Sequence, residues 1–227
     1  MEFIVLSLFF CFFVFLFSLF LLSRDDFIFL KKEISLEKIF NLALISGIVA
    51  LFSARFIFVL LNPSSLFINP LAFILFPYFP GLSLAGGILG GFIFLAIYTY
   101  RKKMPVGRIL DFFSVSTLCA IPFGYLGYFI LTQSFNKQEI LEVALFGIFS
   151  IVVLFLIQSG KNLKIKEGTL GLSFLIVFSF ILLLGRGVAM SKLSFLILPE
   201  SLILLCSFVV SLLFLLRQEI FSRILKK

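Results

Sequence analysis

Long apolar runs recur along the chain, and short segments that hold most of its charged residues separate them. An α-helix needs about 20 predominantly apolar residues to cross the hydrocarbon core of a bilayer. The pattern therefore predicts seven membrane-spanning helices, over residues 3–22, 39–61, 84–100, 109–131, 140–158, 169–185 and 195–216. The expected fold class is all-α, with residues 1–227 forming a single polytopic bundle of about seven transmembrane helices.

Composition supports a membrane protein and excludes a soluble domain. Hydrophobic residues make up 62% of the 227 residues and the mean hydropathy is +1.24, values typical of polytopic helical proteins. Residues 3–22 are expected to be retained as the first span. The run is longer than the apolar core of a signal peptide, Glu2 precedes it in place of a basic region, and no small-residue cleavage pattern follows it.

The distribution of Lys and Arg predicts the orientation in the membrane. Loops 23–38, 101–108 and 159–168 and the C-terminal tail hold 15 of the 19 cations, whereas the loops after the second, fourth and sixth spans hold 3. Cytoplasmic loops carry the excess of positive charge, so we expect the N-terminus outside and the C-terminus in the cytoplasm. The net charge of +8 then favours contact with anionic lipid headgroups and gives no reason to expect nucleic-acid binding.

Arg55 lies inside the second predicted span, toward its outer end, and Arg186 stands at the outer end of the sixth. Arg55 occurs in FSARFIFVLLNP, and Arg186 stands between two glycines in LLLGRGVAM. Each is either an interfacial anchor whose charge reaches the headgroups or a site for an anion, since intramembrane charges are often functional. Asp111, at the start of the fourth span, is expected to complement the dipole of its own helix and to pair with Arg108.

No cofactor or metal is expected. Cys11, Cys119 and Cys206 lie far apart within predicted spans and have no metal-ligand spacing, so we interpret them as small packing residues.

Glycines cluster at residues 81–91, in GLSLAGGILGG. Their overlapping GxxxG pairs favour close helix packing. The preceding loop, residues 62–81, contains four prolines among apolar stretches, and we interpret it as a re-entrant or interfacial element on the outer side, because such backbone must be buried in protein or line a cavity. We expect Gly86, Gly87, Gly124 and Gly127 to hold the third and fourth spans close beside such a cavity.

Four stretches carry a resemblance to a known family. They are ISLEKIFNLALISGIVALFSARFIFVLLNP, PGLSLAGGILGG, RKKMPVGRILDFFSV and PFGYLGYFI. From about Ser35 to Thr132 the chain resembles the prolipoprotein diacylglyceryl transferases, and the likeness is looser around Arg186 and residues 199–216. The resemblance implies a lipid-accessible cavity between the second, third, fourth and sixth spans, open toward the outer leaflet.

The chain keeps the family's small residues and loses several of its polar ones. Ser83, Gly86, Gly87 and Gly90 match one family block, but Ala85 stands where the family has a histidine, and the chain contains no histidine. In the second block Gly124 and Gly127 match, Tyr125 replaces an arginine, Tyr128 replaces an asparagine, and Gln133 falls near the family's glutamate.

The resemblance implies transfer of a diacylglyceryl group from phosphatidylglycerol to the thiol of a lipobox cysteine in a prolipoprotein, in a bacterial plasma membrane. Arg55 and Arg186 would bind the phosphate. For Arg186, the lipid phosphate is expected as the partner in preference to Glu200. Ser83, Gly86, Gly87, Gly124 and Gly127 would border the phosphatidylglycerol site. Tyr125 and Tyr128 are the candidate catalytic residues.

Two alternatives remain open. Loss of a general base typically costs about 10² to 10⁴ in rate, which favours a catalytically inactive relative that binds lipid or lipoprotein. A small transporter or channel subunit is the other alternative. Transporters often place broken helices in corresponding positions of two halves, whereas the Gly and Pro interruptions here lie mostly in one half.

Overall fold

The computed structural model describes residues 2–24, 26–63, 73, 81–132, 136–159, 166–189, 196 and 198–224, and within these ranges it is helical without strands. The helices are α1 (Glu2–Ser23), α2 (Phe27–Lys31), α3 (Leu36–Leu61), α5 (Leu84–Arg101), α6 (Val106–Thr132), α7 (Lys137–Ser159), α8 (Thr169–Ala189) and α9 (Pro199–Ile224). Seven of them, all but α2, are long and apolar enough to cross a membrane. The predicted all-α polytopic class and the seven spans are therefore confirmed.

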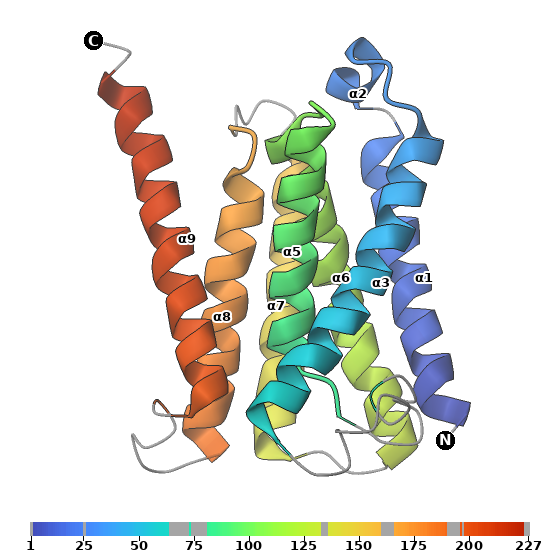
Figure 1. Ribbon diagram of the computed structural model, residues 1–227, viewed down its shortest axis with the longest axis vertical. Helices are drawn as coiled ribbons and strands as arrows, with labels where there is room; N and C mark the ends of the chain where they lie inside the picture. Colours follow the sequence, from blue (N-terminus) through green and yellow to red (C-terminus); the bar gives the residue numbers. More distant parts are fainter. Residues whose placement is uncertain are drawn as a thin grey trace.

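The seven long helices run up and down in one bundle (Figure 1). At one end of the bundle α1, α5, α7 and α9 begin and α3, α6 and α8 finish. We call this the N-terminal end of the bundle, because α1 begins there. The opposite end, where α9 finishes and α2 lies, is the C-terminal end. Most of the loop residues 62–81, interpreted from the sequence as a re-entrant or interfacial element, lie outside the described residues, as do residues 160–165 and 190–195.

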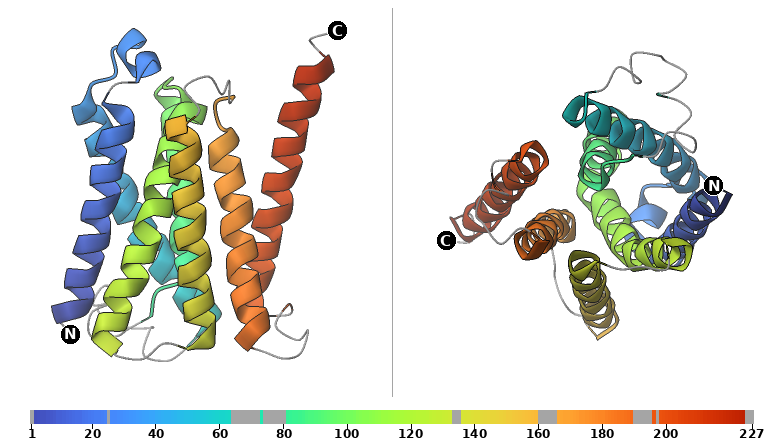
Figure 2. Two further views of the ribbon diagram at one scale, coloured as in Figure 1. Left: turned by 180° about the vertical axis from the view of Figure 1, so that it is seen from behind. Right: turned by 90° about the horizontal axis from the view of Figure 1, so that it is seen from below.

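Helices pair closely within the bundle. α1 packs mainly on α6, α3 on α5, and α8 on α9. Viewed from the N-terminal end, α1, α3, α5 and α6 form one group, and α7, α8 and α9 lie to its side (Figure 2). Many large apolar side chains point outward along these helices, such as Phe13, Phe52 and Phe155, as expected for surfaces that face lipid.

The four glycines predicted to hold the third and fourth spans close beside a cavity pack against α3 and α1. Gly86 and Gly87 of α5 face Ile57 and Ala54 of α3, where a Cβ at Gly86 would come within 2.6 Å of Ile57 Cβ. Gly124 and Gly127 of α6 instead face Cys11 and Ser7 of α1. Each pair lets two backbones approach, but the partners are neighbours that a linear pattern does not identify.

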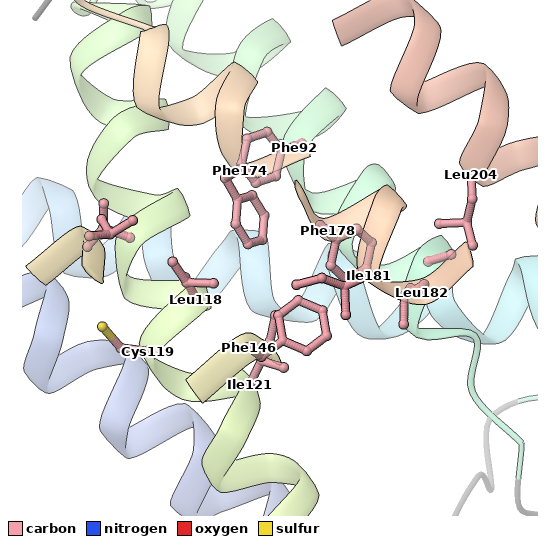
Figure 3. Packing of buried hydrophobic residues seen from close by; sticks show 13 residues of the cluster. Phe92, Leu118, Cys119, Ile121, Phe146, Phe174, Phe178, Ile181, Leu182 and Leu204 are labelled. Atoms are coloured by element: carbon pink, nitrogen blue, oxygen red, sulfur yellow. The ribbon is translucent and has the colours of Figure 1, made fainter. Parts of the chain in front are cut away.

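Two apolar clusters form the interior. One joins α1, α2, α3, α5 and α6. The other joins α5, α6, α7, α8 and α9, and within it Phe174 stacks on Phe92 and on Phe178, with ring centroids 5.6 and 5.7 Å apart (Figure 3). Ala85 and the half-buried Tyr125 belong to this second cluster. It thus reaches both the start of α5 and the last two turns of α6.

A proline within α6 is accommodated by α7. Pro122 has no N–H, which leaves the carbonyl of Leu118 without its usual helical donor. Ser150 Oγ of α7 lies 2.8 Å from that carbonyl oxygen and is buried. A neighbouring helix therefore satisfies the backbone group, as an apolar interior requires.

Acidic residues at the C-terminal end tie helices together. Asp111 is 1% exposed and accepts hydrogen bonds from the backbone N–H groups of Gly168 and Gly171, both 2.8 Å long, so it caps α8. Arg108 donates to Asp26 at 2.6 Å and lies over the Phe112 ring. The expected pair of Asp111 with Arg108 is therefore wrong. Asp111 complements the N-terminus of another helix instead, where free N–H groups attract a carboxylate.

Candidate functional site

Polar side chains gather in two groups, each within two helical turns of the N-terminal end of the bundle. The Arg55 group consists of Arg55, Gly81 and Ser83 at the junction of α3 and α5. The Glu142 network consists of Tyr125, Gln138, Glu142, Arg186, Glu200 and Ser201 from α6, α7, α8 and α9. All of these residues except Gly81 carry ionisable or hydrogen-bonding side chains, which membrane interiors disfavour unless they are paired.

Arg55 connects α3 to the segment before α5. Its guanidinium donates to the backbone carbonyls of Phe73, at 3.2 Å, and Gly81, at 2.7 Å, and the residue is only 3% exposed. This burial does not fit an arginine whose charge reaches the headgroups. Carbonyl oxygens supply the acceptors that a guanidinium needs in an apolar environment, so Arg55 organises the backbone that leads into α5.

The start of α5 is fixed by Ser83 and Gly81. Ser83 Oγ accepts from the N–H of Gly86 as the N-cap, and the N–H of Ser83 donates to the Ala54 carbonyl of α3. Gly81 has φ +140° and its Cα faces the Phe58 ring, which leaves no room for a Cβ. The predicted site residues Ser83, Gly86 and Gly87 therefore have structural contacts with α3.

Glu142 is the centre of the second group. It is 3% exposed, although it lies within a span. Tyr125 Oη donates to Oε2 at 2.5 Å, and Gln138 Nε2 donates to Oε1 at 2.8 Å. The carboxylate lies against Gly185 of α8, where a Cβ would overlap Oε1. Glycine at this position therefore makes room for the carboxylate between α7 and α8.

Arg186 links the network to α9. Its guanidinium forms an ion pair with Glu200 and donates to Ser201 Oγ at 3.0 Å. Arg186 also lies near enough to Tyr125 and Glu142 to act on both electrostatically. Glu200 is the protein partner of Arg186 in the structure, and the lipid phosphate expected from the sequence stays a prediction. The pair is partly accessible, with side-chain exposures of 19% and 30%.

The two candidate catalytic tyrosines have different environments. Tyr125 stacks on Phe146, with ring centroids 6.3 Å apart, and reaches Glu142. Tyr128 is 47% exposed. The structure thus brings Tyr125 together with Arg186, whereas Arg55 binds the segment at the start of α5. Gln133 lies outside the described residues.

Glu142, Gln138 and the Arg186–Glu200 pair were not anticipated as one site. Glu142 occurs in the predicted span 140–158, and an ionisable residue inside a span is itself a signal of function. Gln138 lies one turn before Glu142 on α7, whereas Tyr125, Arg186 and Glu200 come from α6, α8 and α9, so spacing along the sequence could not have joined those three to the site.

The arrangement combines a proton-accepting carboxylate, a phenol and a guanidinium. Within the described residues, no three or more His, Cys, Asp or Glu side chains are grouped so that they could hold a metal ion. A small recess between α6, α7 and α8 is lined by Ser114, Leu118, Phe149 and Phe174, among others. None of the predicted site residues lines this recess, so it does not correspond to the expected lipid cavity.

Comparison with known proteins gives one consistent description. A family model described as prolipoprotein diacylglyceryl transferase matches residues 5–216. A phosphatidylglycerol–prolipoprotein diacylglyceryl transferase of Streptococcus pyogenes serotype M3 is 30% identical over 107 residues, which are 47% of this chain and 41% of that protein. The match thus spans less than half the length of that relative. No solved structure matches the chain.

Proposed function

The chain belongs to the prolipoprotein diacylglyceryl transferase family, and on that premise we propose that it binds phosphatidylglycerol and transfers its diacylglyceryl group to the thiol of a lipobox cysteine. The observation that carries the proposal is the Glu142 network, a buried polar site at one end of a multi-pass apolar bundle. Its location suits a substrate whose polar headgroup lies at the membrane surface.

The reaction sets two chemical requirements. A sulfur–carbon bond forms between the cysteine and the diacylglyceryl group while the carbon–oxygen bond to phosphate breaks, so glycerol phosphate leaves with the bonding electron pair. The thiol must lose its proton, because the thiolate is the nucleophile. The phosphate must meet positive charge in a partly dry site, where fixed charges act most strongly.

We assign the phosphate contact primarily to Arg186. Its pair with Glu200 is partly exposed, and a lipid phosphate can replace the carboxylate as a bidentate partner of the guanidinium. Arg55 is buried and hydrogen-bonded to two backbone carbonyls. Its proposed role is therefore to hold the start of α5, with Ser83, Gly86 and Gly87, at the lipid site. Gly124 and Gly127 keep α6 against α1.

The orientation proposed from the sequence is consistent with this assignment. Most Lys and Arg residues belong to the loops at the C-terminal end of the bundle, and cytoplasmic loops carry the excess of positive charge. The N-terminal end of the bundle would therefore face the outside. Phosphatidylglycerol of the outer leaflet would then reach Arg186 directly. In this proposal the chain works in a bacterial plasma membrane, with its C-terminus in the cytoplasm.

Competition between Glu200 and phosphate supplies the test. Native mass spectrometry would measure binding of phosphatidylglycerol and of phosphatidylcholine to the wild type and to three variants. We expect Arg186→Ala to weaken phosphatidylglycerol binding selectively, and Glu200→Gln to strengthen it, because the guanidinium loses its internal partner.

Arg217→Ala provides the matched control, since Arg217 is an exposed cation near the other end of α9. Its effect on either lipid should be small. Equal binding of both lipids by the wild type, Arg186→Ala and Glu200→Gln would contradict the assignment of Arg186 to the phosphate.

One alternative retains a specific basis. The chain lacks histidine, and Tyr125 stands where the family resemblance has an arginine, which favours a catalytically inactive relative that binds lipid or lipoprotein. Selective phosphatidylglycerol binding without any transfer to a lipobox peptide would support that alternative.

A further inference from the structure

Glu142 is a buried carboxylate, and within the described part of the chain the side chains that hydrogen-bond to it are a phenol and an amide, neither of which is a cation. Its two oxygens accept from Tyr125 at 2.5 Å and from Gln138 at 2.8 Å. A carboxylate in a membrane helix carries a substantial insertion cost, and such residues usually face the bundle interior and serve a function.

The surroundings are built around this side chain. Tyr125 is held by stacking on Phe146, and Gly185 leaves the space that the carboxylate occupies. The ionisable groups that act on Glu142 are Tyr125 of α6, Glu139 of α7 itself and Arg186 of α8. Arg186 forms its ion pair with Glu200 and donates to Ser201, both of α9. The charge of Arg186 is thus balanced by Glu200, and Glu142 remains available as a base.

We propose that Tyr125 and Glu142 form the proton relay that deprotonates the acceptor thiol. This inference rests on the proposed transferase function and names the groups that would take the place of a histidine base. Tyr125 contacts the thiol, and Glu142 acts through Tyr125 as a positioning and proton-accepting residue.

The relay moves one proton in two linked transfers. The thiol proton passes to Tyr125 Oη while the phenolic proton passes to Glu142 Oε2. The thiolate then attacks the glyceryl carbon, the sulfur–carbon bond forms, and glycerol phosphate departs with the electrons of the carbon–oxygen bond. Tyr125 ends unchanged, Glu142 ends protonated, and release of that proton to water restores the site.

Other bases in the described part of the chain are less suitable. The chain has no histidine. Asp26 and Asp111 lie at the C-terminal end, where they pair with Arg108 and cap α8. Glu139 accepts from the N–H of Asn136, and Glu200 pairs with Arg186. Glu142 combines burial, a position near the proposed phosphate site and a phenol as its direct partner.

Accessibility decides which member of the relay touches substrate. Glu142 is 3% exposed, whereas Tyr125 is half-buried and packs against the cluster that includes Ala85 of α5. A thiol that approaches from the α5 side would meet the phenol first. A phenol alone is a poor base at neutral pH because its reference pKa is about 10, so the carboxylate is needed as the final proton acceptor.

The test measures transfer from phosphatidylglycerol to a lipobox peptide as a function of pH for the wild type, Glu142→Gln, Tyr125→Phe and the control Glu37→Gln, which changes an exposed carboxylate in the first turn of α3. We expect both relay variants to lose about 10²- to 10⁴-fold in kcat near neutral pH, with phosphatidylglycerol binding unchanged. The deficit should shrink above about pH 8.5, where the free thiol ionises without a base.

Each outcome bears on a separate claim. Normal kcat in Glu142→Gln, or a deficit that high pH does not reduce, would overturn the relay while leaving the transferase proposal intact. Absence of transfer by the wild type at every pH would overturn the proposed function and the relay with it. Tyr125→Phe preserves the ring stack on Phe146, so it keeps the test decisive if Glu142→Gln does not fold.

Discussion

Replacing Gly86 with alanine should destabilise the protein, whereas the same replacement at Gly147 should not. A Cβ at Gly86 would lie 2.6 Å from Ile57 Cβ and 2.9 Å from Ile57 Cγ1. Ile57 branches at Cβ and cannot rotate that atom away, so α3 and α5 must move apart. A Cβ at Gly147 of α7 meets nothing within 4 Å.

The magnitude follows from two opposing terms. Alanine favours a helix over glycine by about 1 kcal/mol, and this gain applies to both variants. Overpacking costs about 1 to 3 kcal/mol and applies only at Gly86. Gly147→Ala should therefore be more stable than Gly86→Ala by about 1 to 3 kcal/mol, and Gly87→Leu should lose more than Gly86→Ala because a far larger side chain must enter the α3–α5 contact.

Unfolding in detergent can be followed with a thiol-reactive fluorescent dye in a background that lacks Cys11 and the exposed Cys206, because the remaining Cys119 is buried in the folded protein. Far-ultraviolet circular dichroism in an SDS titration gives the free energies. Equal stability of Gly86→Ala and Gly147→Ala would refute the close α3–α5 contact, and with it the position assigned to the start of α5.

Two further predictions concern the other end of the bundle and the orientation. Asp111→Ala should lower the stability by about 0.5 to 2 kcal/mol through loss of the α8 cap, whereas Glu167→Ala, an exposed change beside the same turn, should have little effect; a melting temperature of Asp111→Ala equal to wild type would contradict the capping role. Cysteines introduced at positions 105 and 164 should react with a membrane-impermeant reagent only from the cytoplasmic side, and a cysteine at position 136 only from outside, in a background without the native cysteines; labelling of position 136 from the cytoplasm alone would reverse the proposed topology.

The helices follow closely from the sequence because the bilayer requires long apolar runs. The predicted span 39–61 corresponds to α3, which starts earlier, at Leu36, because Ser35 caps a first turn that contains Glu37 and Lys38. The predicted span 195–216 corresponds to α9, which continues to Ile224. Hydropathy marks the apolar part of a helix, whereas capping and hydrogen bonding determine where the helix ends.

The site was only partly predictable because its contacts join distant parts of the chain. Arg55, Arg186 and Tyr125 were found as polar residues in apolar surroundings or through the family resemblance. The partners of Arg186 and Tyr125 lie on α9 and α7, and no local pattern specifies those contacts. The glycines were correctly predicted to be close-packing residues, but their partner helices depend on how the whole bundle assembles.

Identification of the transfer product tests the central claim most directly. Purified wild-type protein would be incubated with phosphatidylglycerol and a synthetic lipobox peptide, with a peptide in which serine replaces the cysteine as the matched control. Mass spectrometry should find a diacylglyceryl thioether on the cysteine peptide alone, together with an equal amount of glycerol phosphate. Binding of phosphatidylglycerol with neither product above the protein-free level would contradict the transferase proposal.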